Sequence, residues 1–176
     1  MTVTGRPEND RSTGRLTHID EHGHAHMVDV TGKPPTRRAA EARCSVRTTA
    51  DVTALLVELP GDIDLVEAAR FSGIQAAKKT SSLIPLCHPI RLDGVTVDVE
   101  VATDGFRIVA VTEVIERTGV EMEALTACAA AALTLLQPLL HIDPLTSIEG
   151  LTLWRKTGGR SGTWRRSEDG EMSVES

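Results

Sequence analysis

Residues 95–112, Val-Thr-Val-Asp-Val-Glu-Val-Ala-Thr-Asp-Gly-Phe-Arg-Ile-Val-Ala-Val-Thr, decide the fold of this chain. Apolar residues alternate with polar ones on both sides of Thr103-Asp104-Gly105, and this alternation is typical of two half-buried strands. An Asp-Gly pair between two such runs favours a tight turn, because glycine readily adopts a positive φ. The stretch therefore predicts an antiparallel β-hairpin with one face in the core.

The segments around this hairpin supply the remaining elements of a single domain, which a chain of 176 residues accommodates. Their apolar residues recur at every second position, as in a strand, or at three- and four-residue spacing, as in a helix. In chain order they predict a strand over 41–49, helices over 51–59 and 65–79, the hairpin, a helix from 121 and a strand over 147–155. This order defines an α+β fold, a ferredoxin-like split βαβ sandwich whose antiparallel sheet carries helices on one face.

Two details of the helix after the hairpin can be read from its sequence. Thr118 and Glu121 have the spacing of a capping box, in which each side chain bonds the backbone N–H of the other residue. Pro138 lacks the N–H of an interior helical residue, so we expect the helix to kink or end near Gln137.

The two ends of the chain differ from the domain between them. Residues 1–15 are polar and have no period that could bury a face, and the tail has the same character. We therefore expect a disordered arm over 1–15, one domain over 16–164 and a disordered tail over 165–176.

Three histidines alternate shortly after this arm. His22, His24 and His26 would share one face of a strand, an arrangement that can bind a metal ion. No carboxylate or cysteine is placed to complete a ligand set, and no Cys-x-x-Cys pair suggests zinc. We interpret the histidines as solvated loop residues and expect no metal site.

Composition and charge restrict the partners of the protein. With 19 basic against 25 acidic residues the net charge is -6, which argues against nucleic acid or an anionic membrane. Cys44, Cys87 and Cys128 are widely spaced in apolar settings, as in a cytoplasmic protein with reduced thiols. We expect no signal peptide and no run long enough to span a bilayer. Apolar surface on the open sheet face favours a homo-oligomer.

Residues 73–90, Gly-Ile-Gln-Ala-Ala-Lys-Lys-Thr-Ser-Ser-Leu-Ile-Pro-Leu-Cys-His-Pro-Ile, form the candidate site. Two prolines keep the strip between them stiff and out of a helix. Adjacent side chains of an extended strip point to opposite faces, so Cys87 and His88 do not form a nucleophile–base pair. Histidine ordinarily titrates near neutrality, which makes His88 a candidate acid–base group, while Cys87 is either a small buried residue or a reactive thiol. Lys78 replaces the second glycine of a P-loop, which excludes that motif.

Four segments occur together and in order along the chain. They are Leu16-Thr-His-Ile19 with Met27-Val-Asp-Val30 and Lys33; Gly73-Ile-Gln-Ala-Ala-Lys78 through Ile84-Pro-Leu-Cys-His-Pro89; Thr118-Gly-Val-Glu-Met-Glu-Ala-Leu-Thr126; and Lys156-Thr-Gly-Gly-Arg-Ser-Gly162. On these segments, from about Leu16 to Trp164, the chain resembles the cyclic pyranopterin monophosphate synthase family of molybdenum cofactor biosynthesis.

The resemblance implies a ferredoxin-like subunit of a homohexamer, a trimer of dimers with active sites at subunit interfaces. It also implies a GTP-derived substrate whose ribose is bonded to its purine, and a lyase reaction that forms a cyclic phosphate and releases pyrophosphate. Such chemistry needs cations for the triphosphate, a proton shuttle and carboxylates at the guanine-like edge, and we expect no cofactor. The expected catalytic residues are His88, Glu121 and Lys156, and the expected substrate-binding residues are Lys33, Arg38, Leu86, Cys87, His88, Met122 and Glu123.

The chain departs from the family pattern at three positions. Gln137 and Leu140 stand where the family has a catalytic aspartate and a lysine, and a further lysine is missing between Arg47 and Ala77. Glutamine cannot transfer a proton as a carboxylate does, and leucine cannot neutralise phosphate charge. Two functions stay open: an enzyme with retained, altered or reduced family chemistry, and a non-catalytic nucleotide-binding homologue or regulatory subunit that joins a catalytic paralogue in a mixed oligomer. A third, an unrelated phosphate-binding scaffold, requires a different fold.

Overall fold

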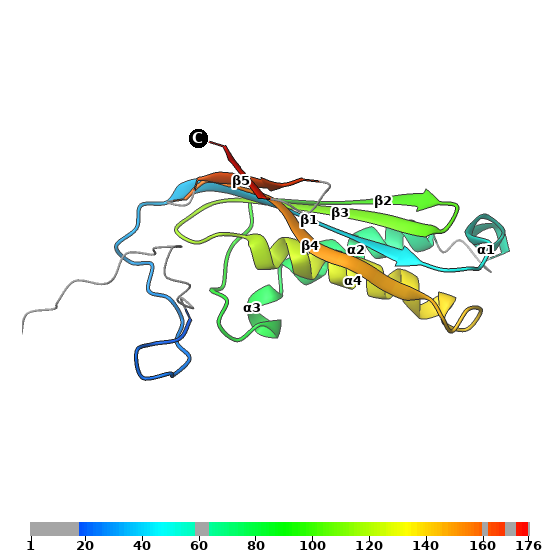
Figure 1. The fold of residues 1–176 in the computed structure, drawn as a ribbon, viewed down its shortest axis with the longest axis horizontal. Coiled ribbons are helices and arrows are strands. Elements are labelled where there is room, and N and C mark those ends of the chain that lie inside the picture. The colour runs from blue at the N-terminus through cyan, green and yellow to red at the C-terminus, as the bar shows by residue number, and fades with distance from the viewer. Residues whose placement is uncertain (1–17, 59–63, 160–161, 168–171, 176) are drawn as a thin grey trace, which may run out of the picture.

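The computed structural model describes residues 18–58, 64–159, 162–167 and 172–175. Its strands are β1 (Thr36–Arg47), β2 (Gly94–Ala102), β3 (Gly105–Glu116), β4 (Ser147–Thr157), β5 (Thr163–Arg166) and β6 (Met172–Glu175). Its helices are α1 (Val52–Glu58), α2 (Leu65–Ala77), α3 (Thr80–Leu83) and α4 (Glu121–Leu139). Figure 1 shows the long helices α2 and α4 on one side of the sheet.

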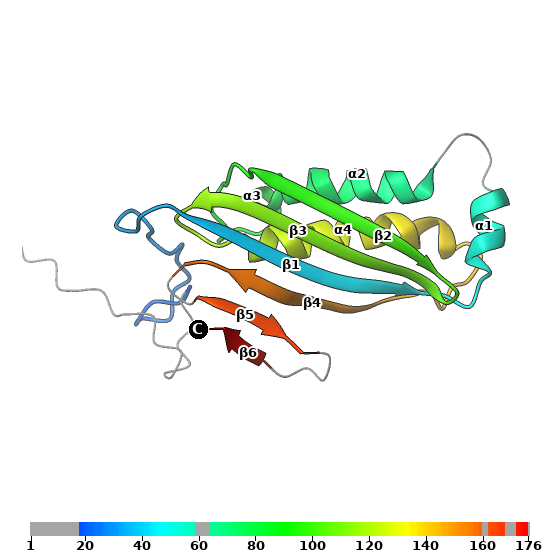
Figure 2. The same cartoon turned by 90° about the horizontal axis from the view of Figure 1, so that it is seen from above.

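The strands of the described part form one six-stranded sheet in the order β2-β3-β1-β4-β5-β6, and every neighbouring pair is antiparallel. β1, α2 and β2 form one βαβ unit, and β3, α4 and β4 form a second (Figure 2). Each unit is split, because a strand of the other unit lies between its own two strands. The α+β, ferredoxin-like fold expected from the sequence is therefore confirmed.

The hairpin that the sequence predicts is formed by β2 and β3. Val97 and Val99 are buried in the core, whereas Asp98 between them is exposed. Gly105 has a φ of 134°, and a side chain there would overlap the carbonyl oxygen of Val46 on β1. Glycine at this position therefore serves both the turn and the close contact between β3 and β1.

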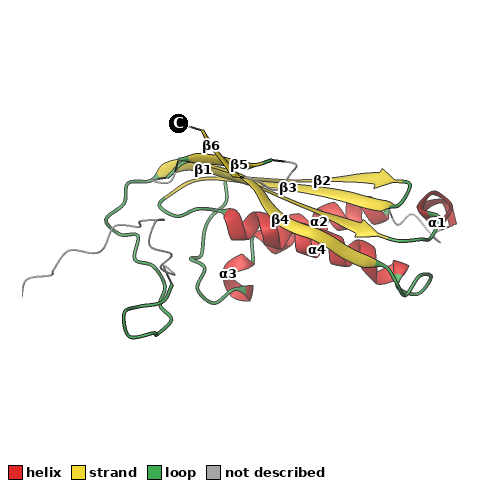
Figure 3. Cartoon of the chain, in the orientation of Figure 1, coloured by secondary structure: helices red, strands yellow, loops and turns green. Residues whose placement is uncertain are grey.

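The helices pack on one face of the sheet (Figure 3), and small side chains line the contact made by α2. Ala69, Gly73 and Ala77 lie on the buried stripe of α2. A Cβ atom at Gly73 would lie 2.9 Å from the carbonyl oxygen of Ala127 on α4 and 3.0 Å from Cγ2 of Val97 on β2. Because no side chain separates them, α2 contacts both α4 and the sheet at this point.

The carboxyl group of Asp143 holds the connection from α4 to β4 in place. Its Oδ2 accepts a hydrogen bond from the Thr49 backbone N–H at 2.7 Å and from the hydroxyls of Thr48 and Thr49 at 2.9 Å. Its Oδ1 accepts the Leu145 N–H at 2.9 Å. These donors, the Thr49 N–H foremost, lower the pKa of Asp143 to about 2. The loop after β1 is thereby joined to the start of β4.

The start of α4 differs from the expected capping box. The N-cap is Val120, and no side chain caps the helix. Thr112 on β3 donates its buried hydroxyl to the carbonyl oxygen of Val120 at 2.9 Å, and Glu121 bonds Lys156 instead of the backbone. Tertiary hydrogen bonds therefore replace the local capping pair.

α4 also ends later than expected. It continues through Pro138 to Leu139, and the N–H of Leu140 bonds the carbonyl oxygen of Leu136 at 3.0 Å. A proline this close to the helix end removes one hydrogen bond without breaking a following turn. By length and composition α4 could cross a bilayer, which we did not expect from the sequence, but its buried stripe packs against β1 and β3 as a core helix.

Two boundaries of the sheet also differ from the sequence prediction. β1 begins at Thr36 rather than Glu41, and β5 and β6 lie where we expected a disordered tail. β5 extends the sheet through backbone pairing with β4, which does not require alternating apolar side chains. These strands overlap the tail expected over 165–176, whose disorder stays a prediction, and the arm over 1–15 lies outside the described residues.

The open face of the sheet carries ion pairs beside apolar side chains such as Ile115. Arg37 pairs with Glu113 at 3.4 Å and Arg43 pairs with Glu41 at 2.5 Å, beside a groove of about 350 Å³. None of the residues that line this groove is a predicted site residue. Exposed apolar side chains occur on the strands, at Val101, Ile115 and Leu151, and in the last turns of α4 and its connection to β4, at Leu133, Leu140, Ile142 and Leu145. The sheet therefore carries part of the exposed apolar surface, and the homo-oligomer stays a prediction.

We expect the substitution Gly73→Ala to destabilise the fold although alanine favours a helix. Helix propensity alone would stabilise α2 by roughly 0.5–1 kcal/mol. The added methyl group would lie 2.9 Å from a backbone oxygen of α4, and moving the helices apart costs about 1–3 kcal/mol. Urea unfolding followed by circular dichroism measures the net loss, with Ser72→Ala on the same helix as the control. A Gly73→Ala protein more stable than the parent would contradict this packing.

Candidate functional site

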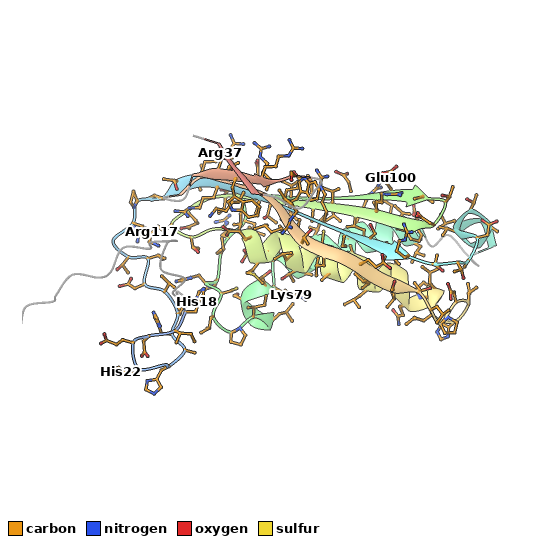
Figure 4. All side chains as sticks on the ribbon, viewed as in Figure 1. His18, His22, Arg37, Lys79, Glu100 and Arg117 are labelled. Atoms are coloured by element: carbon orange, nitrogen blue, oxygen red, sulfur yellow. The ribbon has the colours of Figure 1, made fainter. Side chains whose placement is uncertain are left out.

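The candidate site lies at the end of the sheet where α4 begins. The N-terminal arm, residues 18–35, approaches the same end of the domain (Figure 1). Nη1 of Arg117, just after β3, donates to the carbonyl oxygen of Thr31 on this arm at 3.4 Å. Figure 4 shows Arg117 beside the arm. Arg117 therefore ties the arm to the domain, a role that sequence reasoning missed.

Lys156 and Glu121 form the central ion pair of the site. Nζ of Lys156 lies 3.1 Å from Oε1 of Glu121, and the two side chains are 16% and 29% exposed. Lys156 pairs across the sheet with Ala40, whose side chain is buried in the core. Because cross-strand partners point to the same face, Lys156 points toward the helices. β4 is two residues longer than predicted, and this extra length fixes the position of Lys156.

Glu123, the second carboxyl group in the first turn of α4, is nearly buried. Its exposure is 4%, and burial raises its pKa to about 7. A hydrogen bond from its own backbone N–H opposes this shift, and the negative charge of Glu121 adds to it. Near neutral pH, Glu123 therefore populates both protonation states and can exchange a proton with a bound ligand.

Cys87 lies within electrostatic reach of Glu123. Burial raises the pKa of its thiol, and the charge of Glu123 raises it further. The thiol therefore stays protonated at neutral pH, which favours a small uncharged residue over a nucleophile. All three cysteines are free, as expected. The proximity of Cys87 to Glu123 places the strip 86–88, between α3 and β2, beside the start of α4.

Arg38 on β1 reaches the loop that follows β4. Its Nε donates to the carbonyl oxygen of Glu116 at 2.9 Å. Gly159 has a φ of 75°, and a Cβ atom there would lie 2.6 Å from Nη1 of Arg38. Glycine suits this backbone conformation and also leaves room for the guanidinium group. The guanidinium group of Arg38 is therefore a second cation beside the glycine-rich segment that follows Lys156.

The remaining predicted residues lie in the N-terminal arm, in the strip 86–88 and at the start of α4. Lys33 is half-buried in a turn where its N–H bonds the carbonyl oxygen of Val30 at 3.1 Å. Leu86 and His88 are half-buried in the strip, and Met122 is 38% exposed at the start of α4. The catalytic and binding roles expected for these residues stay predictions.

Gln137 and Leu140 lie at the opposite end of α4. An α-helix rises 1.5 Å per residue, so Gln137 is about 24 Å along the axis from Glu121. Gln137 is exposed, and Leu140 is 42% exposed. Their spacing of three residues places them on one face of the helix. A single chain therefore does not bring these two positions to the site at Lys156.

Fold and site together define a class of protein, an α+β ferredoxin-like domain with a Lys–Glu ion pair and a nearly buried carboxyl group of raised pKa at the start of its second long helix. Comparison with protein families agrees with this class. The chain belongs to the MoaC family, whose family model matches residues 27–159. The matched range contains every predicted site residue.

Curated relatives are similar over nearly the whole chain. It is 48% identical over 160 residues to cyclic pyranopterin monophosphate synthase 2 of Mycobacterium bovis, which covers 90% of this chain and 95% of the relative. It is 46% identical over 170 residues to cyclic pyranopterin monophosphate synthase of Streptomyces avermitilis, covering 95% and 100%. The enzyme of the same name from Thermomicrobium roseum is 48% identical over 157 residues, covering 88% and 95%. The resemblance drawn from the four sequence segments is confirmed.

The raised pKa of Glu123 predicts a pH-dependent stability that Glu123→Gln removes. The unfolded chain ionises this carboxyl group near the ordinary pKa of 4.5, while the folded protein holds the proton up to about pH 7. The free energy of unfolding therefore falls as the pH rises through this window and stays low above it. Glutamine has no charge to bury, so Glu123→Gln should be more stable than the parent at about pH 8.

Urea unfolding on both sides of the window measures this effect. Glu100→Gln, at an exposed position of β2, is the matched control and should follow the parent at every pH. A parent protein whose stability did not fall between the two conditions, or a control that gained as much as Glu123→Gln, would show that Glu123 is not the buried titrating group.

Proposed function

We propose that this chain is a cyclic pyranopterin monophosphate synthase-like protein that binds a cyclised, GTP-derived triphosphate in molybdenum cofactor biosynthesis. Its membership of the MoaC family and the names of its relatives support this pathway. The observation that carries the substrate class is the ion pair between Lys156 and Glu121 beside the nearly buried Glu123. A cation that can bind phosphate and a carboxyl group that can bind a guanine-like ring lie together there.

In the free protein, Glu121 neutralises the charge of Lys156. A triphosphate carries several negative charges, so it competes with a single carboxylate for the same ammonium group. Arg38, whose guanidinium lies against Gly159, and Lys33 on the arm are the further proposed phosphate-binding cations. Ligand binding then exchanges one carboxylate for phosphate oxygens at Lys156 and releases Glu121 toward the reacting part of the ligand.

Glu123 suits the guanine-like edge of the proposed substrate. An ionised carboxylate can accept two hydrogen bonds from adjacent N–H donors. Such donors stabilise the charged form, so binding lowers the pKa of Glu123 from about 7 and releases a proton at neutral pH. His88, Glu121 and Lys156 remain the proposed groups for proton transfer during opening of the purine ring.

A purine nucleoside triphosphate, with GTP as the probe at low salt, should raise the melting temperature of the parent protein. Lys156→Gln should lose most of this shift, because it removes the cation. Glu121→Gln breaks the same ion pair but keeps the cation, so its shift should be equal to or larger than that of the parent. Scanning fluorimetry of each protein with and without GTP separates binding from intrinsic stability.

The pair of variants makes the result decisive. An unchanged shift in Lys156→Gln would remove Lys156 from the binding site. An equal loss in both variants would assign the ion pair a structural role only, and no shift in the parent would leave the triphosphate proposal without support.

The residues at the far end of α4 favour a second function, in which the chain is a non-catalytic homologue or a regulatory subunit. Gln137 and Leu140 carry neither the carboxylate nor the cation that the family has there, and each lost acid–base group costs about 10²–10⁴-fold in rate. We propose reduced activity of the chain alone in the cytoplasm. The assemblies to test are a homo-oligomer, a hexamer built as a trimer of dimers, and a mixed oligomer in which a paralogue supplies the missing groups.

The purified chain should convert the cyclised GTP derivative far more slowly than the roughly 1–10³ turnovers per second of ordinary enzymes. Gln137→Asp combined with Leu140→Lys should recover part of the turnover. α4 continues through Pro138, so both new side chains would lie on one helix face. Pyrophosphate release measures the rate, with Gln137→Asn plus Leu140→Met as the uncharged control. Ordinary turnover by the parent would contradict the proposal of reduced activity.

A further inference from the structure

The indole of Trp164 lies beside the site, and the proposed function does not use it. Trp164 is on β5 and pairs across the sheet with Lys156 on β4. Lys156 in turn pairs with Ala40 on β1, whose side chain is buried in the core. Cross-strand partners point to the same face of a sheet. Trp164 therefore shares the helix-covered face with Lys156.

The neighbouring pair of residues supports this orientation. Arg155 and Arg165 lie opposite each other on the same two strands, and both are exposed. Arg155 also pairs with Glu41 on β1, the residue after the buried Ala40. Successive residues of a strand point to opposite faces. These arginines therefore belong to the open face of the sheet, and Trp164 belongs to the other.

The turn after β4 keeps the two strands in this register (Figure 2). Gly158 has a φ of 83°, and a Cβ atom there would lie 2.2 Å from the carbonyl oxygen of Arg37 on β1. Glycine is the residue that fits this position, so the chain can turn directly after β4. Nε of Arg166 on β5 donates to the carbonyl oxygen of Leu153 on β4 at 3.2 Å. These contacts hold Trp164 next to the ion pair of Lys156.

Trp164 differs from the other tryptophan and phenylalanine side chains, of which the whole chain has three. Phe106 is buried in the core, and Phe71 lies on α2. On the open face, the guanidinium carbon of Arg43 lies 4.2 Å from the ring centroid of Trp154. Within the described residues no cation or aromatic ring stacks on Trp164, which is only half-buried. Its indole can therefore accept a flat ligand.

We propose that the purine ring of the ligand stacks on the indole of Trp164 while its phosphates bind Lys156. The inference rests on the proposed function and adds the group that holds the base. Bases stack on aromatic side chains through their flat π faces, and losing one such contact weakens binding by roughly tenfold. The family model matches residues 27–159, so Trp164 lies beyond the matched range.

Lys156 lies between the groups that such a ligand needs. Its Nζ is 3.1 Å from Oε1 of Glu121 on α4, and Trp164 lies opposite it on β5. Opposed side chains of neighbouring strands have Cβ atoms about 5 Å apart, and the ribose of a nucleotide separates base and phosphate by a similar length. A ring stacked by its face keeps its edge free, so the carboxyl groups of Glu121 and Glu123 can still bind that edge.

The two tryptophans of the chain allow a direct test, because they lie on opposite faces of the sheet. Trp154→Phe leaves Trp164 as the single tryptophan, and Trp164→Phe leaves Trp154. GTP should quench the fluorescence of Trp154→Phe in a saturable manner, because the base contacts its remaining indole. It should dim Trp164→Phe only by its own absorption. Equal quenching of both variants would contradict a contact between the base and Trp164.

Isothermal titration calorimetry at low salt separates stacking from phosphate binding. Inorganic tripolyphosphate carries the charges of the triphosphate without the base. Trp164→Leu should weaken GTP binding by roughly tenfold and leave tripolyphosphate binding unchanged. Trp164→Phe keeps an aromatic ring and should retain most of the affinity for GTP. Circular dichroism shows that each variant keeps its fold.

The outcomes distinguish this inference from the proposed function. If the parent binds GTP no better than tripolyphosphate, or if Trp164→Leu binds GTP as the parent does, the stacking is wrong and the phosphate site stands. If the parent binds neither probe, the proposed function fails and the stacking fails with it. A Trp164→Leu protein that loses both probes equally would show that Trp164 has a structural role only.

Discussion

The close approach of α2, α4 and the sheet at Gly73 is the constraint on which the rest of the structure depends. Small side chains on α2 and at Ala127 and Ala131 of α4 let both helices lie flat against the sheet. The start of α4 is then positioned by the hydrogen bond from Thr112 to Val120. This position of α4 brings Glu121 next to Lys156 at the end of β4. The geometry of the site therefore depends on how the helices pack.

The two carboxyl groups of the site have different electrostatic environments. Glu121 and Glu123 share one helical turn, yet one is paired with Lys156 and the other is almost fully buried. One carboxylate lies against the ammonium group of Lys156, and burial raises the pKa of the other to about 7. Two chemically identical groups therefore lie in different environments, which suit the different roles proposed for them. The far end of α4, at Gln137 and Leu140, offers neither.

Local signals predicted the elements and their order well. Alternation in β2 and β3 identified the hairpin, and the order of strands and helices identified the split βαβ fold. The errors occurred where a side chain found a distant partner or the backbone made its own contacts. Glu121 bonds Lys156 instead of capping its helix, and β5 joins the sheet by backbone pairing.

The sequence by itself determined the fold class, the family and the residue types available to the site, because periodicity, turn chemistry and short motifs act over a few neighbouring residues. Only the tertiary structure decided how those residues divide their roles. Glu121 and Lys156 are 35 residues apart, and Glu123 interacts electrostatically with Cys87, which is also distant along the chain. Electrostatic effects vary with distance and exposure, which local patterns do not specify and packing does.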